Sequence, residues 1–225
     1  MNNLPPITKN LLIINALCFL GMFAAQKYGI DLTEFLGLHF FLASQFNPIQ
    51  IITYMFMHAN FEHIFFNMFA LWMFGRTLES VWGSKRYLIY YLLCGIGAGV
   101  IQEIVQFVQY EAVLSNYQAI ALGSSTIPMS EYLNMMTTVG ASGAIYGILI
   151  GFGMLFPNAE MFIIPIPFPV KAKYFVVGYV VLELFLGIFT SSDGVAHFAH
   201  LGGMLVGFIL IKYWKNKGQI GQYNF

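Results

Sequence analysis

Long apolar segments alternate with shorter polar ones along nearly the whole chain. Six of them have about the 20 residues that a helix needs to cross the hydrocarbon core of a bilayer. We expect membrane-spanning helices at residues 11–28, 57–76, 87–109, 139–156, 172–190 and 195–214. No internal repeat or low-complexity tract divides the sequence. The pattern therefore predicts an all-α polytopic membrane protein, a six-transmembrane-helix bundle in one domain that covers residues 1–225.

Composition agrees with this prediction. Hydrophobic residues make up 58% of the chain and charged residues only 9%, and the mean hydropathy is +0.71. A soluble domain averages about 25% charged residues, which this chain lacks, so we expect an integral membrane protein. The formal net charge is zero, which does not indicate a nucleic-acid partner. Cys18 and Cys94 both lie in apolar segments, where we expect packing rather than a disulfide.

The basic residues predict how the chain lies in the membrane, because loops on the cytoplasmic side carry an excess of Lys and Arg. Only Lys27 falls on the other side of the predicted membrane. The remaining nine are Lys9, Arg76, Lys85, Arg86, Lys171, Lys173, Lys212, Lys215 and Lys217. We therefore expect both termini in the cytoplasm of a bacterial cell and the protein in its cytoplasmic membrane. Residues 29–56 and 110–138 then form long outer loops. The first is rich in aromatic residues and poor in charge, so we expect it to lie partly in the membrane interface.

Polar residues near the outer ends of three predicted spans point to one functional site. His63 and Asn67 share a face of the second span, Ser142 lies near the start of the fourth, and His200 lies near the start of the sixth. All three spans enter from the outer side, and a helix rises about 1.5 Å per residue, which places Ser142 and His200 roughly 5–10 Å deep. Polar groups are costly inside hydrocarbon and tend to mark function. The sequence predicts a polar site that opens to the outer side.

Glycines indicate that the fourth and sixth spans approach closely. They recur at four-residue spacing at Gly143, Gly147 and Gly151 on the fourth span and at Gly203 and Gly207 on the sixth. Small residues let helix backbones come together in membranes. This proximity would bring Ser142 within hydrogen-bond reach of His200. Tyr146, one turn after Ser142, is expected to pack its ring against the imidazole.

Three motifs carry a family resemblance. They are His63-Ile64-Phe65-Phe66-Asn67, Gly140-Ala141-Ser142-Gly143, and Ala199-His200-Leu201-Gly202-Gly203 ending at Gly207. With them the chain resembles the rhomboid family of intramembrane serine proteases. The resemblance implies that Ser142 is the nucleophile, that His200 is the general base, and that His63, Asn67 and the Ser142 backbone N–H form the oxyanion hole. It also implies that the substrates are transmembrane segments of other proteins in the lipid bilayer.

The chemistry of these residues is consistent with that reading. A serine needs a base before it can attack an amide. No acidic residue is placed in the sequence to orient the imidazole, so we expect a Ser142–His200 dyad rather than a triad. Stacking of Tyr146 on the imidazole is expected to take the orienting role. The sequence Phe46-Asn47-Pro48-Ile49-Gln50 stands where members of the family often carry a Trp-Arg pair.

Other readings of the polar residues stay open at this point. His58 and His197 either line the entrance or, as we prefer, bond loop carbonyls. A metal site built from the histidines at 58, 63, 197 and 200 is disfavoured because the His-Glu-x-x-His signature is absent. We therefore expect no metal and no cofactor. Arg76 and Glu79 are expected to pair or to bind neighbouring backbone.

Two rival functions remain. Glu103 and Glu183 are mid-span carboxylates, which would serve as relay groups in a small transporter or as hydrogen-bonding groups between helices. A catalytically inactive rhomboid-like binder of membrane helices would normally lack the serine or the histidine. Both Ser142 and His200 are present, so the sequence favours the enzyme.

Overall fold

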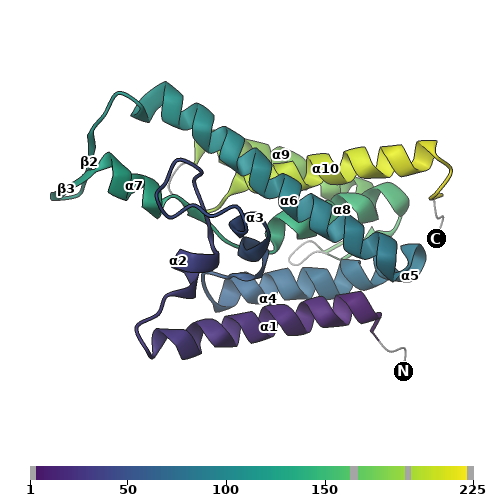
Figure 1. Ribbon diagram of the computed structural model, residues 1–225. Coiled ribbons are helices and arrows are strands. Elements are labelled where there is room, and N and C mark those ends of the chain that lie inside the picture. The colour runs from purple at the N-terminus through teal and green to yellow at the C-terminus, as the bar shows by residue number, and fades with distance from the viewer. Residues whose placement is uncertain (1–3, 163–166, 191–193, 222–225) are drawn as a thin grey trace.

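A computed structural model of the chain describes residues 4–162, 167–190 and 194–221. The described chain is mainly helical, and its long helices run side by side (Figure 1). They are α1 (Pro6–Gln26), α4 (Phe61–Ala70), α6 (Ser84–Gln109), α8 (Ser142–Leu155), α9 (Ala172–Phe189) and α10 (His197–Asn216). One helix thus lies in each predicted span, within about five residues of the expected ends. The start of α1 and the end of α10 lie at the same end of the bundle (Figure 1).

The chain is an integral membrane protein, and three of its described helical stretches are long and apolar enough to cross a bilayer. These are Pro6–Gln26, Ser84–Leu114 and Ala172–Phe189. Helix α8 is apolar but shorter. The count of six spans remains a prediction from the sequence. The stretch expected at 57–76 begins as α4 at Phe61, passes through a π-helical segment (η2, Leu71–Gly75) and continues as α5 (Arg76–Trp82).

Helix α1 starts where its first backbone N–H groups find an acceptor. Pro6 suits the first turn because it has no N–H to satisfy. The Glu79 carboxylate on α5 accepts from the backbone N–H groups of Ile7 (2.9 Å) and Thr8 (2.7 Å). It also accepts from the Thr8 and Ser84 hydroxyls. Burial acts to raise the Glu79 pKa, but these hydrogen bonds outweigh it and hold the pKa below its usual range. Glu79 was expected either to pair with Arg76 or to bind backbone, and it binds backbone.

Helices α6, α8 and α10 form the centre of the bundle, and glycines allow their close contact. A Cβ on Gly203 would lie 1.8 Å from the carbonyl oxygen of Gly143. A Cβ on Gly147 would lie 2.5 Å from the Cys94 sulfur on α6, and one on Gly207 would lie 3.2 Å from the Gly147 Cα. Cys18 and Cys94 are free thiols. The backbones of α8 and α10 thus touch directly where the sequence predicted a small-residue contact.

The segment between α1 and α4, which we predict to be the first outer loop, folds onto the bundle. It contains α2 (Leu32–Leu36), β1 (Leu38–His39), α3 (Gln50–Thr53) and the 3₁₀ turn η1 (Tyr54–Phe56). Strand β1 pairs antiparallel with β4 (Thr137–Thr138), which lies just before Ser142. This pairing ties the segment after α1 to the residues just before Ser142.

Two buried polar side chains anchor that loop. Gln50 accepts from the backbone N–H groups of His39 and Asn47 and donates to the carbonyls of Phe35 and Gln45. Glu103 on α6 accepts from the backbone N–H of Phe41 at 2.7 Å. Of the two roles left open for Glu103, a bond between helices does not describe this contact, because the partner is loop backbone. Gln50 therefore organises the loop.

The second outer segment extends from the end of α6. A π-helical segment (η3, Tyr110–Leu114) leads to a hairpin of β2 (Ala119–Leu122) and β3 (Ser125–Pro128), followed by α7 (Met129–Met135). The hairpin lies at the opposite end of the bundle from the start of α1 (Figure 1). A further short pair, β5 (Glu160–Met161) with β6 (Val170–Lys171), lies between α8 and α9 in the chain.

Candidate active site

Ser142 is placed by a sharp turn at the start of α8. Gly140 has φ +128°, a conformation that side chains rarely adopt, and its N–H donates to the Tyr54 carbonyl at 2.9 Å. A Cβ on Gly140 would lie 2.7 Å from His63 Nε2 and 3.4 Å from Ser142 Oγ. Glycine is therefore required here for two reasons, and the space it leaves open lies between the serine and the histidine of α4.

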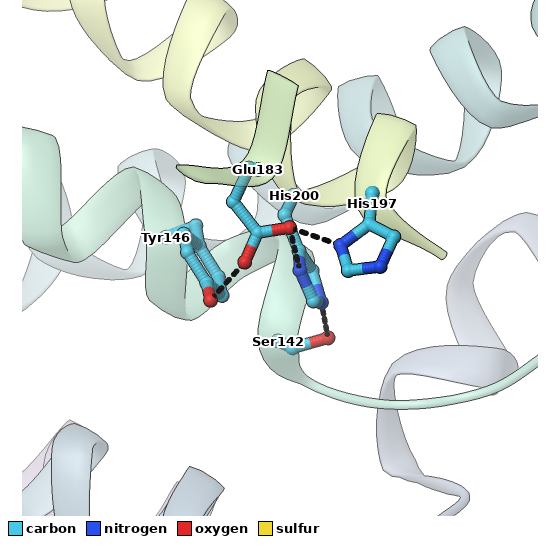
Figure 2. A network of polar contacts seen from close by, with 5 residues as sticks. All are labelled: Ser142, Tyr146, Glu183, His197 and His200. Atoms are coloured by element: carbon cyan, nitrogen blue, oxygen red, sulfur yellow. Dashed lines mark hydrogen bonds and ion pairs between the residues drawn. The ribbon is translucent and has the colours of Figure 1, made fainter. Parts of the chain in front are cut away.

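His200 meets Ser142 across the seam between α8 and α10. The Nε2 atom of His200 lies 2.8 Å from Ser142 Oγ, although the two residues are 58 positions apart (Figure 2). The His200 side chain is buried, and Ser142 is partly buried. The first residues of a helix have backbone N–H groups without an intrahelical acceptor, and Ser142 is the first residue of α8. Its hydroxyl, its N–H and the imidazole therefore gather at one point.

Tyr146 lies one turn after Ser142 and covers the imidazole. Its ring stacks on His200 with 4.2 Å between centroids and an interplanar angle of 11°. The Tyr146 hydroxyl donates a short hydrogen bond to Oε1 of Glu183 on α9. The tyrosine therefore contacts the histidine through its face and a carboxylate through its hydroxyl.

Glu183 overturns the expectation that no acid is placed to orient the imidazole. Its Oε2 lies 3.0 Å from His200 Nδ1 and 2.6 Å from His197 Nδ1. Figure 2 shows the carboxylate between Tyr146 and the two histidines. His197 also bonds this carboxylate through its Nδ1, a contact that the sequence did not predict. Neither Glu183 nor His197 was assigned to the site from the sequence.

A depth argument would have found Glu183. It lies seven residues before the outer end of the predicted span 172–190, which is about 10 Å at 1.5 Å per residue. His200 lies five residues after the start of the predicted span 195–214, about 8 Å deep by the same rise. Two ionisable residues at one depth on successive spans are a signal that was available, although it does not show which faces meet.

His63 and Asn67 lie on α4 beside this cluster. The backbone N–H of Ala59 donates to His63 Nδ1 at 3.4 Å, and His63 Nε2 faces the space at Gly140. Asn67 is buried, and its Nδ2 has no hydrogen-bond partner among the described residues. His58 is fully buried with its ring edge-on to His63 at 5.1 Å, and it lines a cavity of about 190 Å³ next to the end of α1. His63 thus lies beside the serine, and Asn67 follows one turn later on the same helix.

The grouping of possible metal ligands differs from the one considered from the sequence. Within the described chain, Glu183, His197 and His200 bring one ligand-type atom each to within 4.8 Å of one another. His58 and His63 do not belong to that group. A four-histidine site is therefore not formed, and hydrogen bonds through the Glu183 carboxylate already join the three residues.

The comparisons with known proteins agree with one another. The family model described as the rhomboid domain matches residues 45–216. The chain is similar to rhomboid protease AarA of Providencia stuartii, with 28% identity over 162 residues that cover 69% of this chain and 52% of the relative. It is also similar to rhomboid protein 1, mitochondrial, of Saccharomyces cerevisiae (28% identity, 72% and 40% covered). A third relative is rhomboid protease GluP of Bacillus subtilis (28% identity, 71% and 24% covered). The chain spans about half the length of AarA and less of the other two.

Proposed function

Because the chain belongs to the rhomboid family, we propose that it is an intramembrane serine endopeptidase that cuts peptide bonds in or near transmembrane segments of other membrane proteins. The observation that carries the proposal is the 2.8 Å contact between Ser142 Oγ and His200 Nε2 inside a bundle of apolar helices. A serine hydroxyl and an imidazole at this distance are the two groups that acyl transfer needs. The similarity to two relatives named rhomboid proteases supports it.

The acylation step uses the groups already in contact. Ser142 Oγ attacks the scissile carbonyl carbon while its proton passes to Nε2 of His200. The carbonyl oxygen becomes an oxyanion as the C–O bond to serine forms. His200 then donates its proton to the nitrogen of the leaving chain, and the peptide C–N bond breaks. An ester between Ser142 and the new carboxyl end remains.

In this proposal three donors stabilise the oxyanion. They are the Ser142 backbone N–H, Nδ2 of Asn67 and Nε2–H of His63. In neutral His63, Nδ1 accepts a hydrogen bond from the Ala59 N–H, so the ring proton resides on Nε2. Donors of this kind are worth about 3–4 kcal/mol each in the transition state. That gain accounts for a partly buried histidine and a buried asparagine on α4.

Deacylation repeats the same chemistry with water. A water molecule gives a proton to His200 and attacks the ester carbonyl, the oxyanion forms again at the same donors, and Ser142 Oγ leaves with the proton from His200. We expect this water to arrive from the outer side, because Ser142 and His200 lie near the outer ends of their predicted spans. The basic residues predict that both termini are in the cytoplasm.

A cleavage assay tests the proposal. The full chain is reconstituted in liposomes with a single-span substrate protein, and cleavage is followed by mass spectrometry. We expect Ser142→Ala to abolish the product and Ser125→Ala, in the exposed strand β3, to cleave at the wild-type rate. Proteolysis that persists in Ser142→Ala or His200→Ala would reject the proposed mechanism. Transport that depends on Glu183 but not on Ser142 would favour the transporter.

A further inference from the structure

We propose that Glu183 is the positioning residue of this active site. Resting on the proposed function, this inference adds a carboxylate that sets the protonation of His200 and stabilises its cationic form. His197 and Tyr146 hold the carboxylate in place. The site is then a Ser142–His200–Glu183 chain in which each group bonds the next (Figure 2).

The contacts of Glu183 require donors on three sides. Oε1 accepts from the Tyr146 hydroxyl, and Oε2 meets Nδ1 of both His197 and His200. An ionised carboxylate accepts hydrogen bonds and donates none. Both Nδ1 atoms must therefore carry protons. Only 4% of the Glu183 surface is exposed, so these partners take the place of water.

The proton on Nδ1 decides whether His200 can act as a base. A neutral imidazole has one N–H, so a proton on Nδ1 leaves a lone pair on Nε2. That lone pair faces Ser142 Oγ at 2.8 Å and can take its proton. The other tautomer would donate from Nε2 to the serine and could not accept a proton. Glu183 therefore selects the reactive tautomer.

The same carboxylate supports the charge that forms during the reaction. When the Ser142 proton reaches Nε2, His200 becomes an imidazolium with its second N–H directed at Oε2, 3.0 Å away. The proton on Nδ1 stays there, and Glu183 remains ionised throughout. Opposite charges at this distance attract strongly in a buried site. The stabilisation is larger in the transition state than in the ground state, so it raises the rate of the chemical step.

The position of Glu183 on α9 argues against a role in packing alone. The buried residues of α9 are Ala172, Val176 and Glu183, and the first two lie at its inner end. The outer half of the helix thus contributes one buried side chain to the bundle, and that side chain is charged. A carboxylate is costly at this depth, and apolar residues would fill the space at less cost. The cost is explained if the carboxylate serves His200.

A metal ion is the competing explanation for the same three residues. Zinc holds nitrogen and oxygen ligands at about 2.0–2.2 Å, which places two tetrahedral ligand atoms about 3.3 Å apart. The His197 Nδ1–Glu183 Oε2 distance is 2.6 Å, which is the length of a charge-assisted hydrogen bond. The geometry therefore favours a shared proton over a shared metal.

The test replaces each of two buried glutamates by glutamine, which has nearly the same shape and no charge. Glu183→Gln removes the charge at the site, and Glu103→Gln is the matched control, since its partner is loop backbone away from Ser142. We expect Glu183→Gln to lower kcat about 100-fold with KM within about threefold, and Glu183→Asp to recover part of the loss. Glu103→Gln should cleave at the wild-type rate.

The pH profile separates a charge effect from a structural one. His200 is faced by Glu183 from α9, by Ser142 and Tyr146 from α8, by His63 from α4 and by His197 from its own helix. Loss of the Glu183 charge makes protonation of His200 harder. The acid limb of the kcat/KM profile should therefore move to lower pH in Glu183→Gln and stay in place in Glu103→Gln.

A measurement on the wild-type chain covers the case in which Glu183→Gln does not fold. Nitrogen-15 spectra of histidine-labelled protein in detergent micelles should show the proton of His200 on Nδ1. A proton on Nε2, or wild-type kcat and pH profile in folded Glu183→Gln, would overturn the proposal. So would activity that a chelator removes and added zinc restores. If wild type cuts no substrate, the proposed function fails instead, and the position of the proton still tests Glu183.

Discussion

The contact between α8 and α10 and the contact of α9 with these two helices are built in opposite ways. Helices α8 and α10 meet through bare backbone, with Gly203 so close to Gly143 that no side chain fits between them. Helix α9 has few buried residues. Beside Ser142 and His200, the polar contacts of Glu183 join it to α8 and α10. The Ser142–His200 distance is therefore fixed by excluded volume. The ring of His200 is held by directional hydrogen bonds from a helix whose other side chains are mostly not buried.

The largest effect is expected from a change in the glycine seam. In Gly203→Ala the new Cβ would lie 1.8 Å from the Gly143 carbonyl oxygen, and backbone cannot yield as a side chain can. The helices must separate, and a shift of about 1 Å at a catalytic pair can cost 100-fold in rate. We expect at least that loss in kcat/KM and about 1–3 kcal/mol less stability, read from thermal unfolding in micelles.

Gly178→Ala is the control for this change on the other helix. It lies on α9, and a Cβ there would meet no atom within 4 Å. We expect wild-type activity and a stability equal to or slightly above wild type, since alanine favours helix over glycine. Equal losses of activity and stability in Gly203→Ala and Gly178→Ala would show that close contact between α8 and α10 is not required.

A smaller effect is expected at Tyr146, which contacts His200 through its ring and Glu183 through its hydroxyl. Tyr146→Phe keeps the ring that stacks on His200 and removes the hydroxyl that bonds Glu183. Hydrogen bonds to charged groups are typically worth about 1.5–3 kcal/mol, and His197 still holds the carboxylate, so we expect about a tenfold fall in kcat. Tyr146→Leu should lose more, because it also removes the stack. Equal kcat values for the two variants would mean that the ring contributes nothing.

The smallest effect is expected at a carboxylate that joins helices far from the seam. Glu79→Gln removes the charge that binds the start of α1, which should cost about 1–2 kcal/mol at pH 7 without changing kcat. The folded-state pKa of Glu79 lies below its unfolded value of about 4.3. Its contribution is therefore present above that pH and lost as pH falls through the lower folded value.

Thermal unfolding of both forms across pH checks this prediction. The difference between wild type and Glu79→Gln should be constant from pH 7 to about 5 and shrink below about pH 4. A difference that grows on acidification would contradict it.

The sequence is most informative where one physical rule dominates. Apolar length placed a helix in each of the six predicted segments, and the spacing of small residues indicated the contact between α8 and α10. The ends were less accurate, because α1 begins at Pro6 only through the distant carboxylate of Glu79. The π-helical segment Leu71–Gly75 carries no comparable signal in the apolar pattern.

At the site, too, the sequence did not reveal features that depend on how the helices pack. Depth along the spans was enough to suggest that Ser142 and His200 share a level, and the structure brings their side chains within 2.8 Å of each other. Depth does not tell which face of a helix turns inward. Glu183 could therefore be read as a transporter group, and the imidazole was expected to have no acid. The missing information was the rotation of α9 about its own axis, which tertiary packing alone decides.

The most direct test of the central claim is the site and rate of covalent labelling by a fluorophosphonate, which reacts with activated serines. The protein in detergent micelles is treated with the reagent, digested and analysed by mass spectrometry. We predict one adduct, on Ser142, that forms in wild type and at least 100-fold more slowly in His200→Ala. Equal labelling rates in the two proteins, or an adduct on another serine, would contradict the account.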